Sequence, residues 1–213
     1  MADRDAEKRA AAEAAAALVE DGSTVGLGTG STVAHLLPAL ARRELRLRCV
    51  ATSVATEVAA RALGLEVEPF ERLDRLDIAI DGADQVDPGG WLVKGGGGAH
   101  TREKIVAAAA DRFVVIASGD KVVDALAPPV PLELLTFGIP ATLRALGHAE
   151  LRHVPLSPDG GAIADYLGEV RDPVALAARL AGTPGVVDHG LFAPSLVSDV
   201  LVAREGEVEH RPV

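Results

Sequence analysis

Four consecutive glycines follow a lysine in Lys94–Gly98, and this segment is the least ordinary in the sequence. Glycine loses more backbone freedom on folding than any other residue, so a run of four is costly unless the backbone must come close to a ligand. Successive backbone N–H groups can then form a cradle for a negatively charged oxygen, and Lys94 adds a positive charge at its rim. A flexible hairpin tip is the structural alternative.

A carboxylate comes soon after the glycines, in His100-Thr101-Arg102-Glu103-Lys104, which we expect to form the first turn of a helix. The positive end of the helix dipole favours an ionised carboxylate there by about 0.3–1 kcal/mol. The spacing therefore predicts that Glu103 is a base held in its charged form beside the glycine loop. For His100 we expect a packing or hydrogen-bonding role.

Asp81 and Asp84 follow Ile78–Ile80, which is typical of a short buried strand. Two carboxylates at the end of a buried strand cost free energy unless they bind a ligand or exchange protons. Asp87 continues the three-residue spacing, so an oxygen-rich Mg²⁺ or Ca²⁺ site is one alternative, and turn-capping aspartates are another. We favour catalysis or contacts with sugar hydroxyl groups.

A glycine-rich turn, Gly26–Thr32, joins a predicted strand to a predicted helix. Its small residues allow backbone N–H groups to approach an anion at the positive end of the helix. The dinucleotide pattern G-x-G-x-x-G fails because Ser31 or Val33 stands where the third glycine should be, and no Gly-Lys-Ser/Thr follows for ATP. The turn therefore favours a single phosphate over NAD or ATP, so we expect no nicotinamide or flavin cofactor; a tight turn that only packs helix on strand is the alternative.

Two further turns follow predicted strands, at Thr52–Thr56 and Ser118–Lys121. The carboxyl ends of parallel strands meet at one edge of a sheet, so these residues could face the same crevice. Thr52 or Ser53 could equally cap the next helix, and the second turn could be exposed.

The first half of the chain alternates helix and strand patterns, which indicates parallel βαβ units. The apolar run at 113–117 lacks polar alternation, as expected for a sheet covered on both faces. The predicted helices lie at 2–20, 32–43, 56–63 and 101–111, and the predicted strands at 24–28, 47–51, 65–69, 78–80 and 113–117.

Three prolines within Ala127–Pro131 indicate a stiff connector between two domains. Beyond it we expect helices at 142–146 and 174–180, with strands at 151–155, 162–166 and 185–188; a strand at 199–203 could return to the first domain. The predicted fold class is α/β, with a Rossmann-like parallel-sheet domain (1–129 plus about 204–213) and a smaller α+β, ferredoxin-like domain (about 130–203).

The composition excludes several classes of partner. The 213 residues carry a net charge of −10, and only 3% are aromatic, so we expect no nucleic-acid or membrane binding. Cys49 is the only cysteine, which excludes an internal disulfide, and we expect it to be a small buried apolar residue. No signal-peptide pattern or run of 18 apolar residues occurs, so the cytoplasm is the expected location.

Taken together, these segments resemble the type A family of ribose-5-phosphate isomerases over nearly the full length. The matching pieces come in family order: GTGST at 28–32, the Thr/Ser-rich turn at 52–56, DGAD at 81–84, KGGGG at 94–98, REK at 102–104, Lys121, Pro131-Leu132-Glu133, Pro184–Val187 and Gly190-Leu191-Phe192.

The resemblance implies an aldose–ketose isomerase of the non-oxidative pentose phosphate pathway, which interconverts D-ribose 5-phosphate and D-ribulose 5-phosphate without a cofactor. It implies a homodimer or tetramer. By position, Glu103 is the proton-shuttling base, Asp81, Asp84 and Lys94 act on sugar oxygens, and Asp81 is a candidate for opening the furanose ring. The implied substrate-binding residues are Lys8, Thr29, Gly30, Ser31, Thr32, Gly82, Ala83, Gly95, Gly96, Gly97 and Lys121.

Three positions depart from the family pattern. Gln85 stands where the family usually has Glu, His100 where it has Leu, and Asp120 adds an anion beside the expected phosphate ligand Lys121. Two other functions stay open. A sugar-phosphate-sensing domain of a transcription regulator would need a helix-turn-helix, for which we find no room before Ser23, and an aminosugar-phosphate deaminase is the second.

Overall fold

A six-stranded sheet forms the centre of the larger part of the molecule, in a computed structural model that describes residues 3–213. Its strand order is β13-β12-β6-β3-β1-β2, and all neighbours pair in parallel except β12 and β13. The strands are β1 (Thr24–Leu27), β2 (Arg48–Ala51), β3 (Ile78–Gly82), β6 (Phe113–Ser118), β12 (Asp199–Arg204) and β13 (Glu207–Pro212).

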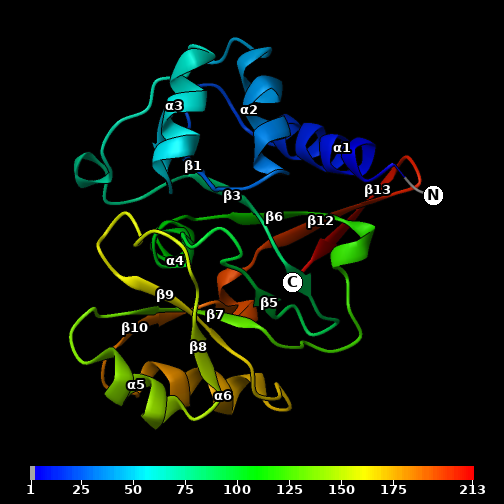
Figure 1. The fold of residues 1–213 in the computed structure, drawn as a ribbon. Helices are drawn as coiled ribbons and strands as arrows, with labels where there is room; N and C mark the ends of the chain where they lie inside the picture. Colours follow the sequence, from blue (N-terminus) through cyan, green and yellow to red (C-terminus); the bar gives the residue numbers. More distant parts are fainter. Residues whose placement is uncertain (1–2) are drawn as a thin grey trace.

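Helices cover both faces of this sheet (Figure 1), which explains why β6 is buried along its whole length. Asp3 caps the first helix by accepting hydrogen bonds from the N–H groups of Asp5 and Ala6. One face carries α1 (Arg4–Ala17), α2 (Val33–Ala41) and α3 (Val54–Ala62), and the other carries α4 (His100–Ala108).

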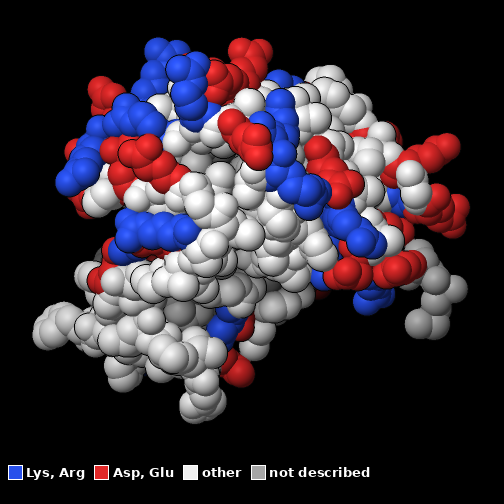
Figure 2. Space-filling model, turned by 90° about the horizontal axis from the view of Figure 1, so that it is seen from above, with Lys and Arg blue, Asp and Glu red and all other residues white. Residues whose placement is uncertain are grey.

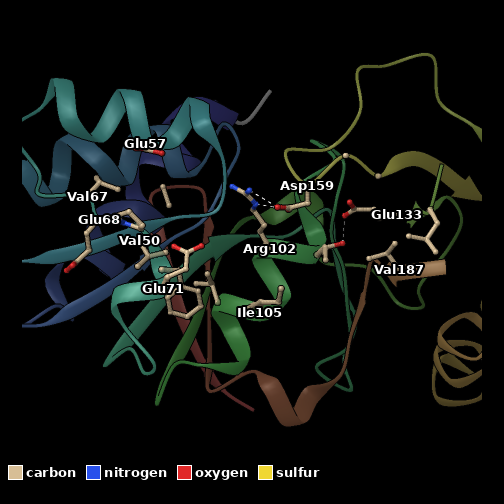
Figure 3. A pocket seen from close by; sticks show the side chains of 18 of the residues that line it. Val50, Glu57, Val67, Glu68, Glu71, Arg102, Ile105, Glu133, Asp159 and Val187 are labelled. Carbon is tan, nitrogen blue, oxygen red and sulfur yellow. Dashed lines mark hydrogen bonds and ion pairs between the residues drawn. The ribbon is translucent and has the colours of Figure 1, made fainter. Parts of the chain in front are cut away.

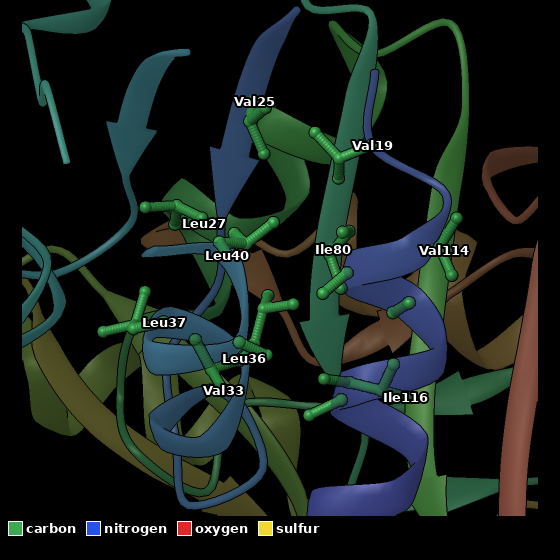
Figure 4. Close-up of a cluster of buried hydrophobic side chains, with 14 of the residues drawn as sticks. Val19, Val25, Leu27, Val33, Leu36, Leu37, Leu40, Ile80, Val114 and Ile116 are labelled. Atoms are coloured by element: carbon green, nitrogen blue, oxygen red, sulfur yellow. The ribbon is translucent and has the colours of Figure 1, made fainter. Parts of the chain in front are cut away.

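The larger core lies between the sheet and the first two helices. In Figure 4, Leu36 and Leu40 of α2 point toward Val25 and Leu27 of β1. The buried face of α1 is alanine, so this helix can approach the sheet and α2 closely. Burial of each large aliphatic side chain stabilises the fold by about 1.5–3 kcal/mol.

A second unit has the chain order β7-α5-β8-β9-α6-β10 and an antiparallel sheet ordered β10-β7-β9-β8. This is the ferredoxin-like arrangement, so the predicted fold class is confirmed. In Figure 1, α5 and α6 lie on the face of the small sheet that points away from the larger domain. The elements are β7 (Val130–Leu134), α5 (Ile139–Leu146), β8 (Ala149–Leu151), β9 (Ala162–Tyr166), α6 (Pro173–Ala181) and β10 (Val186–His189).

A three-stranded antiparallel sheet, ordered β11-β5-β4, joins distant parts of the chain. Its strands are β4 (Gln85–Val86), β5 (Leu92–Val93) and β11 (Leu191–Phe192). Three short 3₁₀ helices, η1 (Phe70–Arg72), η2 (Gly119–Lys121) and η3 (Pro194–Leu196), complete the regular structure of residues 3–213. Because β5 leads directly into Lys94, this small sheet fixes where the glycine loop begins.

Three expectations about single elements were wrong. Residues 65–69 form no strand, because only Val67 bridges to Cys49 at the outer edge of the sheet. The strand expected at 151–155 ends at Leu151 as β8. The segment expected as a connector, 127–131, continues into a central strand, β7, which includes Pro131. This proline pairs with Asp165 of β9 but lies beyond the stretch of β7 that pairs with β10.

The return of the chain to the larger sheet is confirmed at Asp199–Arg204, where β12 pairs in parallel with β6. We therefore propose that the second domain ends before Asp199 rather than at about residue 203. The last strand, β13, escaped sequence analysis because its residues are mostly exposed and polar and show no apolar alternation.

Candidate active site

The site begins where β1 and β3 end side by side. Gly28 lies so close to β3 that a Cβ atom at this position would be 1.9 Å from the carboxyl carbon of Asp81. Asp81 Oδ1 accepts hydrogen bonds from the N–H groups of Thr29 (3.1 Å) and Gly82 (2.7 Å). The glycine-rich turn therefore does more than join strand to helix: it fixes one carboxylate oxygen of Asp81.

Lys94 lies between two carboxylates. Its Nζ atom is 2.9 Å from Asp81 Oδ2 and 3.1 Å from Glu103 Oε2, and it donates to the Gly82 carbonyl at 2.5 Å. The side chains of Lys94, Asp81 and Glu103 are only 3–5% exposed. The structure thus brings three of the four predicted catalytic side chains into one buried cluster.

Gly190 and the strand β11 that follows it support Lys94. Its backbone N–H donates to the Gly190 carbonyl (2.8 Å), and its Nζ lies 5.4 Å from the centre of the fully buried Phe192 ring. A Cβ on Gly190 would lie 2.1 Å from the Lys94 carbonyl oxygen, so the approach needs glycine. The Gly190-Leu191-Phe192 match is therefore part of the support of Lys94.

Burial and the neighbouring Asp81 carboxylate raise the pKa of Glu103 to about 7. The expectation that the helix dipole holds Glu103 charged was wrong in direction, because desolvation outweighs a dipole effect of about 0.3–1 kcal/mol. Burial also raises the pKa of Asp81 above its usual value, against the opposing effect of Lys94. A carboxyl with a pKa near neutrality is suited to taking up and returning a proton.

Burial alone would lower the pKa of Lys94, but the Asp81 and Glu103 carboxylates raise it above its usual value. Lys94 therefore stays charged at neutral pH. A fixed ammonium group at this position can stabilise negative charge that develops on a bound oxygen.

A cavity of about 170 Å³ opens next to this cluster. Gly119 N–H donates to Glu7 Oε2 (3.1 Å), so η2 and α1, which carry Lys121 and Lys8, are in contact. The predicted substrate-binding residues all line this cavity, together with three of the four predicted catalytic residues: Lys8, Thr29, Gly30, Ser31, Thr32, Gly82, Ala83, Asp84, Lys94, Gly95, Gly96, Gly97, Glu103 and Lys121.

Asp81 is the predicted catalytic residue that does not line the cavity. It lies behind Lys94. Asp84, in contrast, faces the glycine loop, where its Oδ2 accepts from the N–H of Gly96 at 2.8 Å. The N–H of Gly98 donates to the Gly95 carbonyl (3.0 Å). Fewer than four N–H groups of the glycine loop are therefore available to a ligand.

The hydroxyl groups at 52–56 support the first turn from beneath. Thr52 Oγ1 lies 2.8 Å from Thr29 Oγ1, and Thr56 Oγ1 donates to the Gly28 carbonyl at 2.9 Å. Ser53 caps α3 by accepting from the N–H of Thr56 (3.2 Å). The capping alternative is thus confirmed for Ser53, and the two threonines hold the glycine-rich turn in place.

Asp87 is separate from the other aspartates and belongs to a turn, where Oδ1 accepts from the N–H of Trp91 at 2.9 Å. Within residues 3–213, no group of three or more His, Cys, Asp or Glu side chains is placed to hold a metal ion. The three-residue spacing of Asp81, Asp84 and Asp87 therefore does not produce a ligand cluster.

The departures from the family pattern have local explanations. Gln85 exchanges two 2.8 Å hydrogen bonds with the backbone of Ala127, which an amide can do from both ends. Asp120 accepts from Ser118 and lies 3.7 Å from Arg4, which supplies a cation other than Lys121.

His100 is fully buried at the start of α4, where a Cβ on Gly95 would lie 2.7 Å from its Nδ1. Burial lowers its pKa to about 4, so it packs against the loop as a neutral ring. Across residues 3–213 neither ring nitrogen has a hydrogen-bond partner, so of the two expected roles only packing is confirmed.

A second, larger cavity of about 810 Å³ lies beside α4 (Figure 3). It is lined by five carboxylates, Glu57, Glu68, Glu71, Glu133 and Asp159. Its one lining cation, Arg102, is held by both oxygens of Asp159 at 2.7 Å. A phosphorylated ligand would be repelled there, so the smaller cavity is the candidate active site.

Sequence analysis did not single out Arg152, which follows β8. Its guanidinium contacts the carbonyl oxygens of Gly95 and Gly96 from the second domain. A lone arginine after a short strand carries no recognisable signal, because its partner loop lies more than fifty residues earlier.

The fold is α/β, the site is a buried lysine–carboxyl cluster at a small cavity, and the comparisons below define the protein as an enzyme of the isomerase class. The chain matches the model of the family "Ribose 5-phosphate isomerase A (phosphoriboisomerase A)" over residues 48–207, more than half of its length. It is 47% identical to the ribose-5-phosphate isomerase A of Methylorubrum extorquens, over 94% of this chain and 93% of that one. The chain belongs to the ribose 5-phosphate isomerase A family.

Solved structures agree. Ribose 5-phosphate isomerase A from Neisseria gonorrhoeae superposes with a TM-score of 0.94 at 31% identity, covering 98% of this chain and 97% of the other. A D-ribose-5-phosphate isomerase in complex with phospho-erythronic acid superposes with a TM-score of 0.91 at 32% identity, with 97% and 98% covered.

A second family model, the DeoR C-terminal sensor domain, matches residues 3–67. This stretch covers α1 to α3 and includes the glycine-rich turn but none of Asp81, Lys94 and Glu103. The similarity to a sensor domain is thus confined to a part of the chain that lacks the buried cluster of Asp81, Lys94 and Glu103.

Proposed function

We propose that this chain interconverts D-ribose 5-phosphate and D-ribulose 5-phosphate in the 170 Å³ cavity, through an enediolate formed by proton transfer at Glu103. The observation that carries the proposal is the buried Glu103 carboxyl, with a pKa raised to about 7, at the wall of a cavity that also presents three lysines and an anion-binding turn. Such a pKa lets one group act first as base and then as acid at neutral pH.

In the forward direction, Glu103 takes the proton from C2 of the open-chain aldose and returns it to C1. The electron pair of the broken C2–H bond forms the C1=C2 double bond, and the π pair of the C1 carbonyl moves to O1, which gains negative charge. Lys94 and the N–H of Gly97, both in the cavity wall, are the donors we assign to that charge. As Glu103 returns the proton to C1, the O2 proton passes to O1, so the carbonyl forms at C2, C1 becomes a CH₂OH group, and no proton is gained or lost overall.

The two aspartates receive different roles. Asp84 lines the cavity, so we assign it to the sugar hydroxyl and ring oxygens. Asp81 lies behind Lys94 and outside the cavity wall, so we propose that it acts by holding Lys94 charged and in place, in preference to direct opening of the furanose ring.

We assign the phosphate to Lys8, Lys121 and the turn Thr29–Thr32 at the N-terminus of α2. A helix N-terminus and ammonium groups are the usual ligands of a phosphate. The ligand of the related isomerase, phospho-erythronic acid, is a phosphorylated sugar acid whose carboxylate resembles a charged enediolate, which supports this division of the cavity. Binding energy from the remote phosphate then holds C1 and C2 against Glu103.

The test is incubation of purified protein with D-ribose 5-phosphate in the presence of EDTA, followed by measurement of ketose. Conversion that is unaffected by EDTA supports the proposal. Binding without conversion would favour a sensing function, release of ammonia from an aminosugar phosphate would favour a deaminase, and EDTA-sensitive conversion would point to a metal at the aspartates.

We also propose that the chain forms a homodimer or tetramer in the cytoplasm and does not bind nucleic acid. Ile105, Leu135, Phe137 and Val187 expose apolar surface beside the larger cavity, and Phe137 is 92% exposed. Light scattering of the wild type and of Phe137→Asp tests this; a wild-type monomer would contradict it.

On the face seen in Figure 2, basic side chains do not form a continuous surface. On the face shown in Figure 2, lysines and arginines are interspersed with acidic residues, which does not favour a nucleic-acid backbone as ligand. No helix within residues 3–213 is long and apolar enough to cross a membrane.

A further inference from the structure

The glycine loop is held from outside the cavity by a residue of the second domain. Nη1 of Arg152 donates to the carbonyl oxygens of Gly95 (3.0 Å) and Gly96 (3.1 Å). Arg152 is not among the residues that line the substrate cavity. It therefore contacts the loop from outside the cavity wall.

The guanidinium is itself fixed. Nε and Nη2 of Arg152 donate to the two carboxylate oxygens of Asp165 at 2.7 and 2.6 Å, and both side chains are only about 20% exposed (19% and 20%). Asp165 belongs to β9, a strand in the interior of the small sheet. A bidentate arginine–carboxylate pair sets the plane of the guanidinium, which a flexible ammonium group cannot do.

Through the geometry of the peptide bond, this contact determines which way the N–H groups of the glycine loop point. A trans peptide is planar, and its C=O and N–H point in opposite directions. Holding the Gly95 carbonyl outward points the N–H of Gly96 inward, where it donates to Asp84 Oδ2 (2.8 Å). Holding the Gly96 carbonyl outward likewise turns the N–H of Gly97 inward, and within residues 3–213 this N–H has no acceptor.

We propose that Arg152, fixed by Asp165, is a positioning residue for the isomerisation: it orients two successive peptides so that Gly96 holds the Asp84 carboxylate and Gly97 presents a free N–H to the substrate oxygen. The proposal rests on the proposed function of this cavity, because it assigns the Gly97 N–H to an oxygen that gains charge during the reaction.

The loop needs such an external support because it has no side chains of its own. Gly95 and Gly98 have φ values of +104° and +73°, in the region that favours glycine, so the conformation is open to many alternatives. Inside the loop one backbone hydrogen bond, from Gly98 N–H to the Gly95 carbonyl, is present among the described residues. Two hydrogen bonds from a fixed guanidinium select one arrangement.

The experiment compares Arg152→Gln and Arg152→Lys with a matched control, Arg112→Lys. Arg112 also makes a partly buried ion pair, with Asp199 at 2.6 Å, but it precedes β6 and so lies at the sheet edge opposite to the site. We expect Arg152→Gln to lower kcat by roughly 100-fold with little change in KM, since small displacements of catalytic groups cost about that much. Arg112→Lys should keep the wild-type kcat.

Arg152→Lys distinguishes orientation from charge. It keeps the positive charge but cannot hold both carbonyls and both oxygens of Asp165, so we expect kcat to stay well below that of the wild type. A wild-type kcat in Arg152→Lys or in Arg152→Gln would overturn the proposal. Hydrogen exchange of a peptide covering residues 92–99 should become faster in both variants and stay unchanged in Arg112→Lys.

Asp165→Asn provides a second route if the arginine variants do not fold. It keeps the shape of the clamp and weakens its charge, so we expect an intermediate loss of kcat and intermediate exchange in the same peptide. Unchanged kcat and exchange in a folded Asp165→Asn would contradict the role of the pair. If the wild-type protein shows no isomerase activity, the proposed function is refuted. The hydrogen-exchange comparison then still tests whether Arg152 holds the glycine loop.

Discussion

The Nζ atom of Lys94 lies 3.1 Å from Oε2 of Glu103, in a place where neither side chain is more than 5% exposed. A cation this close would normally lower the pKa of a carboxyl. Burial and the second carboxylate, that of Asp81, reverse the effect and raise the pKa of Glu103 to about 7. The lysine therefore moderates a shift that would otherwise keep Glu103 protonated at neutral pH.

The first prediction is a pH dependence of activity. Because Glu103 must be ionised to accept the C2 proton, kcat/KM for ribose 5-phosphate should rise with pH and level off above a pKa near 7. Initial rates measured from pH 5 to 9 at constant ionic strength provide the check. A profile that is flat between pH 5 and 8 would show that another group is the base.

The same shift affects stability. A carboxyl whose pKa is raised in the folded state, from 4.5 to about 7, stabilises the protein fully below pH 4.5, and this contribution is lost as the pH rises through 7. Urea unfolding of Glu103→Gln should therefore show a weaker fall in the free energy of unfolding between pH 5 and 7.5 than the wild type. Identical pH slopes would contradict the assigned pKa.

The close approach of β1 and β3 predicts the effect of Gly28→Ala. A Cβ at this position would lie 1.9 Å from Asp81, so the variant must displace Asp81 and with it Lys94. Overpacking of this kind destabilises by about 1–3 kcal/mol, and activity should fall sharply. Gly89→Ala is the control, because its Cβ would make an ordinary contact of 3.4 Å; equal urea midpoints for the two variants would argue against the packing described.

The phosphate assignment predicts a selective effect at Lys121. A hydrogen bond to a charged group contributes about 1.5–3 kcal/mol, so Lys121→Gln should lower kcat/KM for ribose 5-phosphate by roughly 10- to 100-fold. Inhibition by inorganic phosphate should weaken in parallel. If Lys121→Gln binds phosphate as well as the wild type does, the Asp120 side chain beside it has displaced Lys121 from this role.

Much of the site could be predicted from the sequence because its signals are local. The glycine-rich turn and the DGAD segment follow β1 and β3, two neighbouring parallel strands whose carboxyl ends lie together, and the lysine followed by four glycines is recognisable from composition alone. The features that the sequence could not show depend on contacts between residues that are far apart along the chain. The pKa direction of Glu103 depends on burial and on Asp81, and Arg152 meets its loop across the domain boundary.

In the fold, too, local patterns were predictable and long-range pairing was not. Buried strands such as β6 were recognised from continuous apolar runs, whereas β7 was missed because Pro131 argues against a central strand. It is accommodated because pairing with β10 begins only at Leu132. The strand expected at 65–69 has the right composition, but Val67 makes a single bridge at the edge of the sheet.

The central claim, that Glu103 moves the proton, is tested most directly by Glu103→Gln. General acid–base catalysis contributes about 10²–10⁴-fold, so we predict that kcat falls by at least two orders of magnitude, while ribose 5-phosphate binds with nearly unchanged affinity in calorimetry. Retained binding also shows that the variant is folded. Turnover at the wild-type rate in Glu103→Gln would contradict the account.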